Sequence, residues 1–217
     1  MERDVYRDLR GTAKATDLPH VMQAFAAAGD ALGDGDLDRA IELLVWAKSM
    51  ASRSPSIREA LGVARYLSGD YAGAYRDLLS YRRLSGRRDQ NHLLADCARA
   101  AGRHDEVAEY VDEMFEARVP AERLVEGLLV LAGDRADRED LRGALDALAR
   151  TELDPQEVQP WHPRLWYLAG DLWERLGERD RARDYFDAIT AVDEEFLDAE
   201  DRLAALSEGT DGRTVQS

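Results

Sequence analysis

The sequence has very little cysteine and lysine and no long apolar run. Its one cysteine, Cys97, excludes an internal disulfide and a cysteine-based zinc cluster, and we expect it to be a buried, inert thiol. Only Lys14 and Lys48 are lysines, an arginine bias that we attribute to a GC-rich genome. Because no run of 18 apolar residues exists, and no apolar core follows the charged start, neither a membrane span nor a signal peptide is predicted. We expect a cytoplasmic protein.

Positive charge is also in short supply. The chain has 44 Asp and Glu against 29 Lys and Arg, which gives a formal net charge of -15. An acidic chain repels phosphate backbones and anionic lipid, so neither nucleic acid nor a membrane surface is expected as a partner. Hydrophobic residues make up 45% of the chain, which is enough for a packed core and argues against global disorder.

The usual catalytic and metal-binding patterns are missing. The four histidines form neither an H-x3-H nor an H-E-x-x-H pair, so no metal site is predicted. His92 and Asp96 share a helix face with Arg99, which leaves open a catalytic base with an orienting carboxylate. No nucleophile joins them, and a polar stripe on a solvated groove is the favoured interpretation. We therefore predict no enzyme, no catalytic residue and no cofactor.

An acidic turn near residue 35 resembles the start of a calcium loop. Asp34, Asp36 and Asp38 alternate as in D-x-D-x-D-G, but Arg39 stands where glycine is needed and Val45 where glutamate is needed. An interhelical turn with a capping aspartate is the favoured interpretation.

Helical periodicity begins at Asp17, an N-cap candidate, and continues through most of the chain. Residues 1–16 are predicted to be an N-terminal arm or a short helix. Residues 207–217 are predicted to be a disordered tail, because they are polar and contain two glycines. The helical domain is therefore expected to cover residues 17–206.

A turn pattern repeats within this domain. Gly35-Asp36-Leu37 precedes Ala40, and Gly69-Asp70-Tyr71 precedes Ala74, so glycines and alanines are both 34 residues apart. Gly102 follows 33 residues after Gly69. The glycine is expected to end one helix in a left-handed conformation, the aspartate to cap the next, and the alanine to let two helices approach.

The stretch from Trp166 to Phe186 carries the fullest motif. Trp166, Gly170, Trp173, Ala182 and Phe186 follow the pattern W-x2-L-G-x2-Y and A-x3-F, so the chain resembles the tetratricopeptide repeat (TPR) family. Residues 58–78 also resemble uncharacterised actinobacterial TPR proteins, which suggests a bacterial source. The resemblance implies an all-α fold, a right-handed α-solenoid of about five antiparallel helix pairs with a C-terminal capping helix at 196–206.

Two segments depart from the pattern. A fourth unit is expected to begin at Pro120 and to turn near residues 133–137, although its register does not fit the glycine spacing. Residues 151–163 contain three prolines and are predicted to be an extended linker within the helical domain. Trp161 in this linker is expected either to lie on the surface or to pin the linker to the array.

The TPR resemblance also implies a concave groove lined by the first helices of successive pairs. Carrying over the groove positions gives a mixed set of charges with a few aromatic rings: Phe25, Glu59, Tyr66, His92, Asp96, Arg99, Arg123, Arg164, Tyr167 and Asp171. Such a lining suits an extended peptide or a helix. The subtype that clamps a C-terminal carboxylate is excluded, because Gly29, Ala60 and Leu93 stand at three of its binding positions.

The favoured hypothesis is a non-catalytic protein–protein interaction scaffold with a protein or peptide partner. Two alternatives stay open. The first is a peptide-sensing regulatory module of a larger system. The second is a self-assembling structural protein, such as a homodimer that packs through the fourth unit and the linker.

Overall fold

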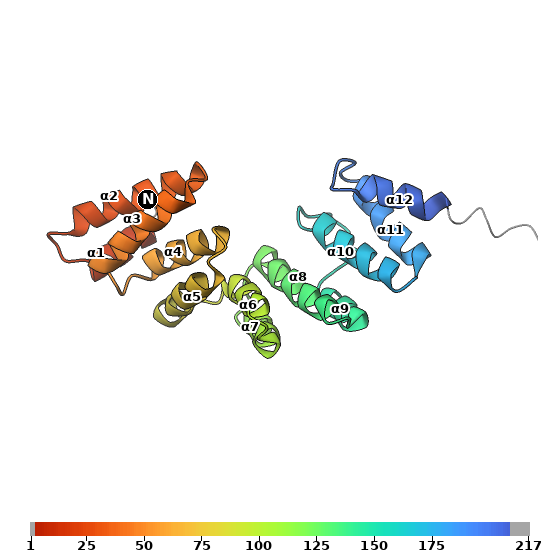
Figure 1. The fold of residues 1–217 in the computed structure, drawn as a ribbon, viewed down its shortest axis with the longest axis horizontal. Coiled ribbons are helices and arrows are strands. Elements are labelled where there is room, and N and C mark those ends of the chain that lie inside the picture. The colour runs from red at the N-terminus through yellow and green to blue at the C-terminus, as the bar shows by residue number, and fades with distance from the viewer. Residues whose placement is uncertain (1–2, 209–217) are drawn as a thin grey trace, which may run out of the picture. The chain divides into compact units, whose positions relative to one another are not determined.

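The computed structural model describes residues 3–208, and all regular structure in this range is α-helical (Figure 1). The predicted tail lies, from residue 209 on, outside the described residues. The helices are α1 (Arg3–Thr12), α2 (Leu18–Gly33), α3 (Leu37–Met50), α4 (Pro55–Leu67), α5 (Tyr71–Ser85), α6 (Asn91–Ala100), α7 (His104–Glu116), α8 (Ala121–Asp137), α9 (Leu141–Leu148), α10 (His162–Arg175), α11 (Arg179–Thr190) and α12 (Ala199–Glu208).

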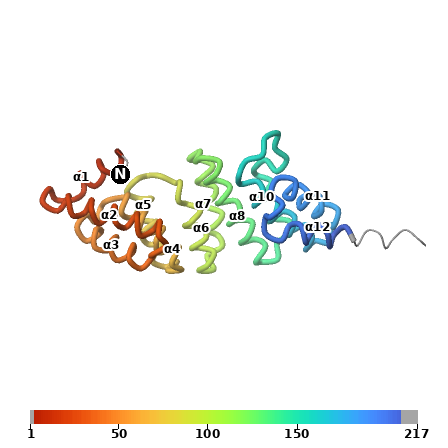
Figure 2. The backbone as a smooth tube through the Cα atoms, turned by 90° about the horizontal axis from the view of Figure 1, so that it is seen from above, coloured from red at the N-terminus to blue at the C-terminus, as the bar shows by residue number. Residues whose placement is uncertain are grey.

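The helices group into two compact units, unit 1 (Met1–Pro120) and unit 2 (Ala121–Ser217). Unit 1 holds α1 and the pairs α2–α3, α4–α5 and α6–α7; unit 2 holds the pairs α8–α9 and α10–α11, followed by α12 (Figure 2). The prediction of an all-α repeat of about five helix pairs is confirmed. No helix within residues 3–208 is both long enough and apolar enough to cross a membrane.

The predicted turn chemistry is present between the paired helices. Positive φ angles of 77°, 82°, 69° and 80° occur at Gly35, Gly69, Gly102 and Gly177. The aspartate that follows the first two of these glycines caps the next helix: Asp36 accepts from the Arg39 amide at 3.0 Å, and Asp70 accepts from the Gly73 amide at 2.8 Å. The acidic turn at residues 34–38 is therefore a helix cap.

The turn predicted near residues 133–137 is wrong. Helix α8 continues through Gly133 to Asp137, and the left-handed residue is Glu139, with φ 61°. Asp140 then caps α9 by accepting from the Gly143 amide at 3.0 Å. Ala144 lies five residues after Glu139, as Ala74 does after Gly69. The fourth pair thus keeps the register of the others, with glutamate at the glycine position.

A small residue stands at the helix crossing of every pair. These residues are buried in the first helix of each pair: Ala28, Gly62, Ala95, Ala132 and Gly170. A Cβ atom added to Gly62 would lie 2.7 Å from Leu78 Cγ, and one added to Gly170 would lie 2.9 Å from Phe186 Cζ. The glycines of the sequence motif therefore mark the closest approaches of paired helices.

Helix α1 is attached to the start of the array. Leu9 is fully buried in a cluster with Val21 and Ile57. The Asp8 carboxylate accepts hydrogen bonds from the Ser54 hydroxyl at 2.6 Å and from the Ser56 amide at 3.0 Å, at the N-terminus of α4. Because the first amides of a helix lack intrahelical partners, Asp8 stabilises α4 as a second cap.

Candidate functional site

In unit 1, three predicted groove residues meet between two successive first helices. The Tyr66 hydroxyl of α4 donates to Asp96 Oδ2 of α6 at 2.7 Å, and the Arg99 guanidinium lies 3.3 Å from Asp96 Oδ1. The Asp96 and Arg99 side chains are 21% and 33% exposed, so a ligand can still reach them. With Glu59, these residues form what we call the α4–α6 face (Glu59, Tyr66, Asp96 and Arg99).

Glu59 is also tied to the next pair, and two other predicted residues contribute mainly to packing. Glu59 accepts from Gln90 Nε2 at 2.8 Å. His92 is only 6% exposed, and its Nδ1 lies 3.1 Å from the carbonyl oxygen of Asp89. Phe25 of α2 is partly buried and packs against two hydrophobic clusters of unit 1. His92 therefore offers a ligand little surface, and Phe25 contributes to the packing of unit 1.

The phenol of Tyr66 and the neighbouring thiol of Cys97 are held in their protonated states. Burial raises the pKa of Tyr66, and the hydrogen bond to Asp96 raises it further, so the hydroxyl stays a donor at neutral pH. Cys97 is buried, as predicted, and burial raises its pKa to about 12. Within residues 3–208, no group of three His, Cys, Asp or Glu side chains is placed to hold a metal ion. The α4–α6 face thus presents hydrogen-bonding and charged groups without an activated nucleophile.

In unit 2, the corresponding side chains of α10 contact α12 and the residue before it. The Tyr167 hydroxyl donates to Asp198 at 2.6 Å. Arg202 of α12 donates to Asp171 at 3.0 Å and to Glu174 at 2.6 Å, and its guanidinium carbon lies 5.4 Å from the centre of the Tyr167 ring. Tyr167 and Asp171, both predicted to line the groove, therefore hold the capping helix in place.

The two remaining predicted residues do not join this cluster. Arg164 of α10 makes a two-pronged ion pair with Glu126 of α8, linking the first helices of the two pairs in unit 2. Arg123 is exposed at the start of α8. The structure therefore brings together Tyr66, Asp96 and Arg99 in unit 1, but it assigns the predicted residues of unit 2 to separate contacts.

Unit 1 also contains a buried charge cluster that the sequence did not reveal. Asp77 of α5 is 1% exposed, and its carboxylate lies 2.5 Å from Arg65, 2.6 Å from Arg58 and 3.3 Å from Lys48. These cations come from α3 and α4. Their spacing from Asp77 follows no local pattern, so only the packing of three helices shows the cluster.

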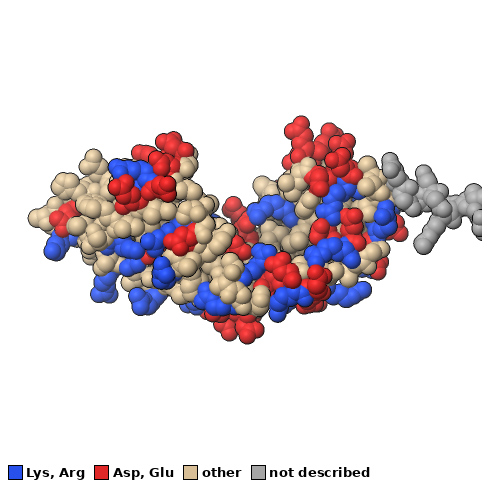
Figure 3. Space-filling view, in the orientation of Figure 1, with Lys and Arg blue, Asp and Glu red and all other residues tan. Residues whose placement is uncertain are grey.

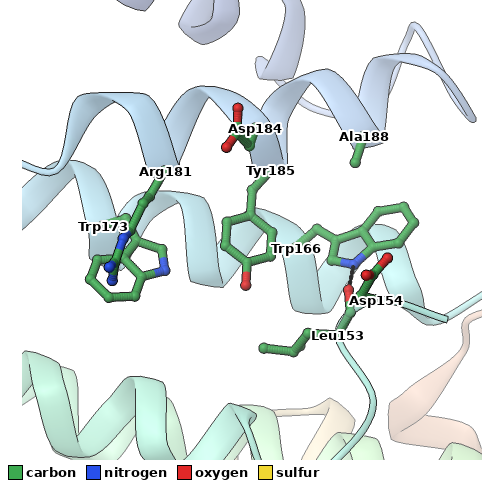
Figure 4. A pocket seen from close by; sticks show the side chains of 8 residues that line it. All are labelled: Leu153, Asp154, Trp166, Trp173, Arg181, Asp184, Tyr185 and Ala188. Carbon is green, nitrogen blue, oxygen red and sulfur yellow. Dashed lines mark hydrogen bonds between the residues drawn. The ribbon is translucent and has the colours of Figure 1, made fainter.

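A second feature that the sequence did not reveal is an aromatic pocket in unit 2 (Figure 4). Its volume is about 440 Å³, and it is lined by Leu153, Asp154, Trp166, Trp173, Arg181, Asp184, Tyr185 and Ala188. The guanidinium carbon of Arg181 lies 4.3 Å from the centre of the Trp173 ring. Burial raises the pKa of Tyr185, which keeps its hydroxyl protonated. The lining residues come from the linker, α10 and α11, so no local sequence pattern indicates the pocket.

The proline-rich linker forms one wall of this pocket. Trp166 Nε1 donates to the Leu153 carbonyl at 2.7 Å (Figure 4), so Trp166, rather than Trp161, pins the linker to the helices. The linker ends at residue 161, two residues earlier than predicted, because α10 begins at His162. Helix α9 has 8 residues, against 12 in α11, so the linker follows a short second helix.

Neither the protein-family models nor the curated proteins give a match to the sequence. Several solved structures do match this chain. The APC/C hetero-tetramer Cut9–Hcn1 matches 88% of this chain with a TM-score of 0.67 at 14% identity, and this chain spans only 37% of the chain that it matches.

Two similar structures have a length close to that of this chain. TTC0263, a TPR protein of Thermus thermophilus, has a TM-score of 0.60 and 15% identity, over 87% of this chain and 99% of its own. YrrB, a TPR protein with an unusual peptide-binding site, has a TM-score of 0.56 and 18% identity, over 82% of this chain and 89% of its own. At these identities the likeness concerns the fold alone, and this chain has the all-α repeat fold of tetratricopeptide-repeat proteins.

Proposed function

We propose that the protein is a non-catalytic interaction scaffold and that the α4–α6 face binds an extended peptide of a protein partner. The observation that carries the proposal is the link from Tyr66 through Asp96 to Arg99, which joins two successive first helices and stays partly exposed. On the basis of the single cysteine and the family resemblance, we place this role in the cytoplasm of a bacterium.

The chemistry of the face suits a peptide main chain. Arg99 supplies N–H donors for peptide carbonyls, while Glu59 and Asp96 supply acceptors for peptide amides. The rings of Tyr66 and Tyr71 meet edge to face with centroids 5.5 Å apart, and Tyr71 is 42% exposed. Such a pair gives a partner one aromatic anchor surrounded by polar contacts, which is the usual composition of a binding hot spot.

Binding on this type of face is limited to unit 1. In unit 2 the corresponding side chains already bind Asp198 and Arg202, so a peptide would have to compete with these contacts. The likeness to YrrB, a TPR protein with an unusual peptide-binding site, supports a peptide partner, although that binding site belongs to YrrB alone.

Photo-crosslinking tests the proposal directly. Val63 lies on α4 between Glu59 and Tyr66 and is partly exposed, whereas Val45 on α3 is 40% exposed and lies outside the α4–α6 face. We would replace each with p-benzoylphenylalanine in cells of the source organism and identify the crosslinked peptides. Crosslinks to one protein from position 63 and not from position 45 would support the proposal. Equal yields from both positions, or none from position 63, would reject it.

A further inference from the structure

Arginine is concentrated in one short stretch of this acidic chain. Five arginines stand at positions 76, 82, 83, 87 and 88, in a protein whose formal net charge is -15. In Figure 3, Lys and Arg side chains line the edge of unit 1 where α5 lies in Figure 1. Because the chain as a whole is negatively charged, this cluster of positive charge needs a local explanation.

Four of these arginines line a single pocket. It has a volume of about 720 Å³ and is lined by Arg76, Leu79, Ser80, Arg82, Arg83, Gly86 and Arg88. Arg76 and Arg83 are seven residues apart, two helical turns, and so lie on the same face of α5. Gly86, with φ 74°, ends α5 and allows Arg88 to turn back toward the helix. We call this the α5 arginine pocket (Arg76, Arg82, Arg83 and Arg88).

Two of the four guanidinium groups are fixed in place. Arg82 is paired with Glu113 of α7, and its guanidinium carbon lies 5.3 Å from the centre of the Tyr110 ring. Arg88 Nε lies 3.1 Å from the same Glu113 carboxylate, and Arg88 Nη1 donates to the Gly86 carbonyl at 3.0 Å. Glu113 also accepts from Asn91. One shared carboxylate thus orients two arginines without balancing both charges.

The other two arginines are exposed. Within residues 3–208, neither Arg76 nor Arg83 has a carboxylate within ion-pair distance. Arginines near a helix C-terminus also complement the helix dipole, which accounts for Arg82 and Arg83. It does not account for Arg76, which lies in the first half of α5, or for Arg88, which lies beyond its end. Four guanidinium groups against one carboxylate leave a strong local excess of positive charge.

We propose that the α5 arginine pocket binds a phosphate-bearing ligand. Guanidinium groups stay charged at all physiological pH values, and their planar fork matches two phosphate oxygens at once. A phosphate monoester carries close to two negative charges on three acceptor oxygens, so one phosphate can engage Arg76 and Arg83 together beside the fixed Arg82 and Arg88. This site is separate from the α4–α6 face and does not depend on the function proposed for it.

The test compares two double variants with the same change in net charge. Arg76→Gln/Arg83→Gln removes the exposed half of the pocket, whereas Arg10→Gln/Arg53→Gln removes two exposed arginines elsewhere in unit 1. Calorimetric titrations would use three probes: inorganic phosphate, a capped peptide with one phosphoserine, and the same peptide with serine. Circular dichroism would check that both variants stay folded.

We expect the wild type to bind at least one phosphate-bearing probe with a Kd of about 1 mM or below, and Arg76→Gln/Arg83→Gln to weaken that binding about tenfold. The Arg10→Gln/Arg53→Gln control should change it less than about twofold. Equal binding of phosphate and phosphopeptide would identify a free phosphate compound as the ligand, and tighter phosphopeptide binding a phosphorylated protein. Equal losses in both variants, equal binding of the serine peptide, or no binding would overturn the proposal.

Discussion

Glu59 of unit 1 and Tyr167 of unit 2 occupy the same position of the repeat, three residues before the small residue at the helix crossing. Glu59 binds Gln90 at the start of α6, and Tyr167 binds Asp198, just before α12. The two contacts are made with the same turn of the following first helix. Helix α12 and the residues before it therefore take the place of a further first helix in unit 2.

The position seven residues further along, two helical turns away, shows what differs. The Tyr66 hydroxyl of unit 1 donates one hydrogen bond to Asp96. Glu174 of unit 2, at the corresponding position, binds Arg202, which also binds Asp171. The contact in unit 1 is a hydrogen bond from an uncharged hydroxyl, whereas the contacts in unit 2 are ion pairs with an arginine. The side chain at this repeat position therefore decides how a first helix is joined to the helix that follows the pair.

The units also differ in charge. Unit 1 has 17 Lys and Arg against 20 Asp and Glu, whereas unit 2 has 12 against 24. In Figure 3, acidic side chains gather over the loop between α11 and α12. Nearly balanced charge in unit 1 permits a buried ion cluster and an arginine pocket. Excess negative charge in unit 2 makes Arg202 more important for holding α12.

The largest effect is expected from breaking the buried cluster of unit 1. Asp77→Asn leaves three cations around a neutral amide, and we expect a loss of about 3 kcal/mol in the free energy of unfolding. Cys97 lies in the same unit and is buried, so its labelling by a thiol reagent reports the opening of unit 1. Labelling should accelerate strongly in Asp77→Asn and stay unchanged in the exposed control Asp38→Asn. Equal rates would show that the cluster contributes no stability.

A smaller effect is expected at the helix crossing of unit 2. Gly170→Ala places a methyl group against the Phe186 ring, and we expect the free energy of unfolding to fall by about 2 kcal/mol. The first pair of unit 1 has Ala28 and Leu44 at these positions, so adding Phe186→Leu should make the alanine tolerable. A double-mutant cycle in urea would measure the coupling. In the control Gly29→Ala the added methyl group meets no neighbouring atom, so this variant should be neutral or slightly stabilising. Additive losses in the cycle would show that the alanine methyl group does not clash with the Phe186 ring.

The third effect concerns the ion pairs by which Arg202 holds α12 in unit 2. Arg202→Gln loses the ion pairs to Asp171 and Glu174, which should cost about 1 kcal/mol because both carboxylates are partly exposed. The amides of α12 should then exchange with deuterium faster than in the wild type. Arg183→Gln, which breaks an exposed pair within α11, serves as the control. Unchanged exchange in α12 would mean that apolar packing and the remaining hydrogen bonds hold the cap without Arg202.

The smallest effect is expected from restoring the repeat at the fourth turn. Glu139 has a left-handed φ of 61°, which costs a side-chain-bearing residue about 1 kcal/mol. Glu139→Gly should therefore stabilise unit 2 by up to about 1 kcal/mol in urea unfolding. Gly69→Ala makes the reverse change in unit 1 and should destabilise it by a similar amount. A loss of stability in Glu139→Gly would show that the glutamate side chain has a structural role.

The sequence predicted the helix pairs well because glycine, aspartate and alanine each have a local reason to stand at the turns. The position of the fourth turn was predicted wrongly because its left-handed residue is Glu139, and the sequence marks such a position only where it holds a glycine. The charge cluster around Asp77 was not predicted because the cations that pair with Asp77 come from two other helices. Tyr167 and Asp171 were predicted to line the groove, and their contacts with Asp198 and Arg202 were not foreseen because the sequence indicates a capping helix without indicating which side chains it contacts.

The most direct test of the account is the affinity of a peptide selected from a displayed library against the wild type. The pair Tyr66→Ala/Arg99→Ala alters the α4–α6 face of unit 1, and Arg164→Ala/Tyr167→Ala alters two predicted groove residues of unit 2. With folding of both variants verified, we predict at least a roughly tenfold loss of affinity for the first and less than about a twofold change for the second. The reverse order, or equal losses, would contradict the proposal that unit 1 carries the binding face.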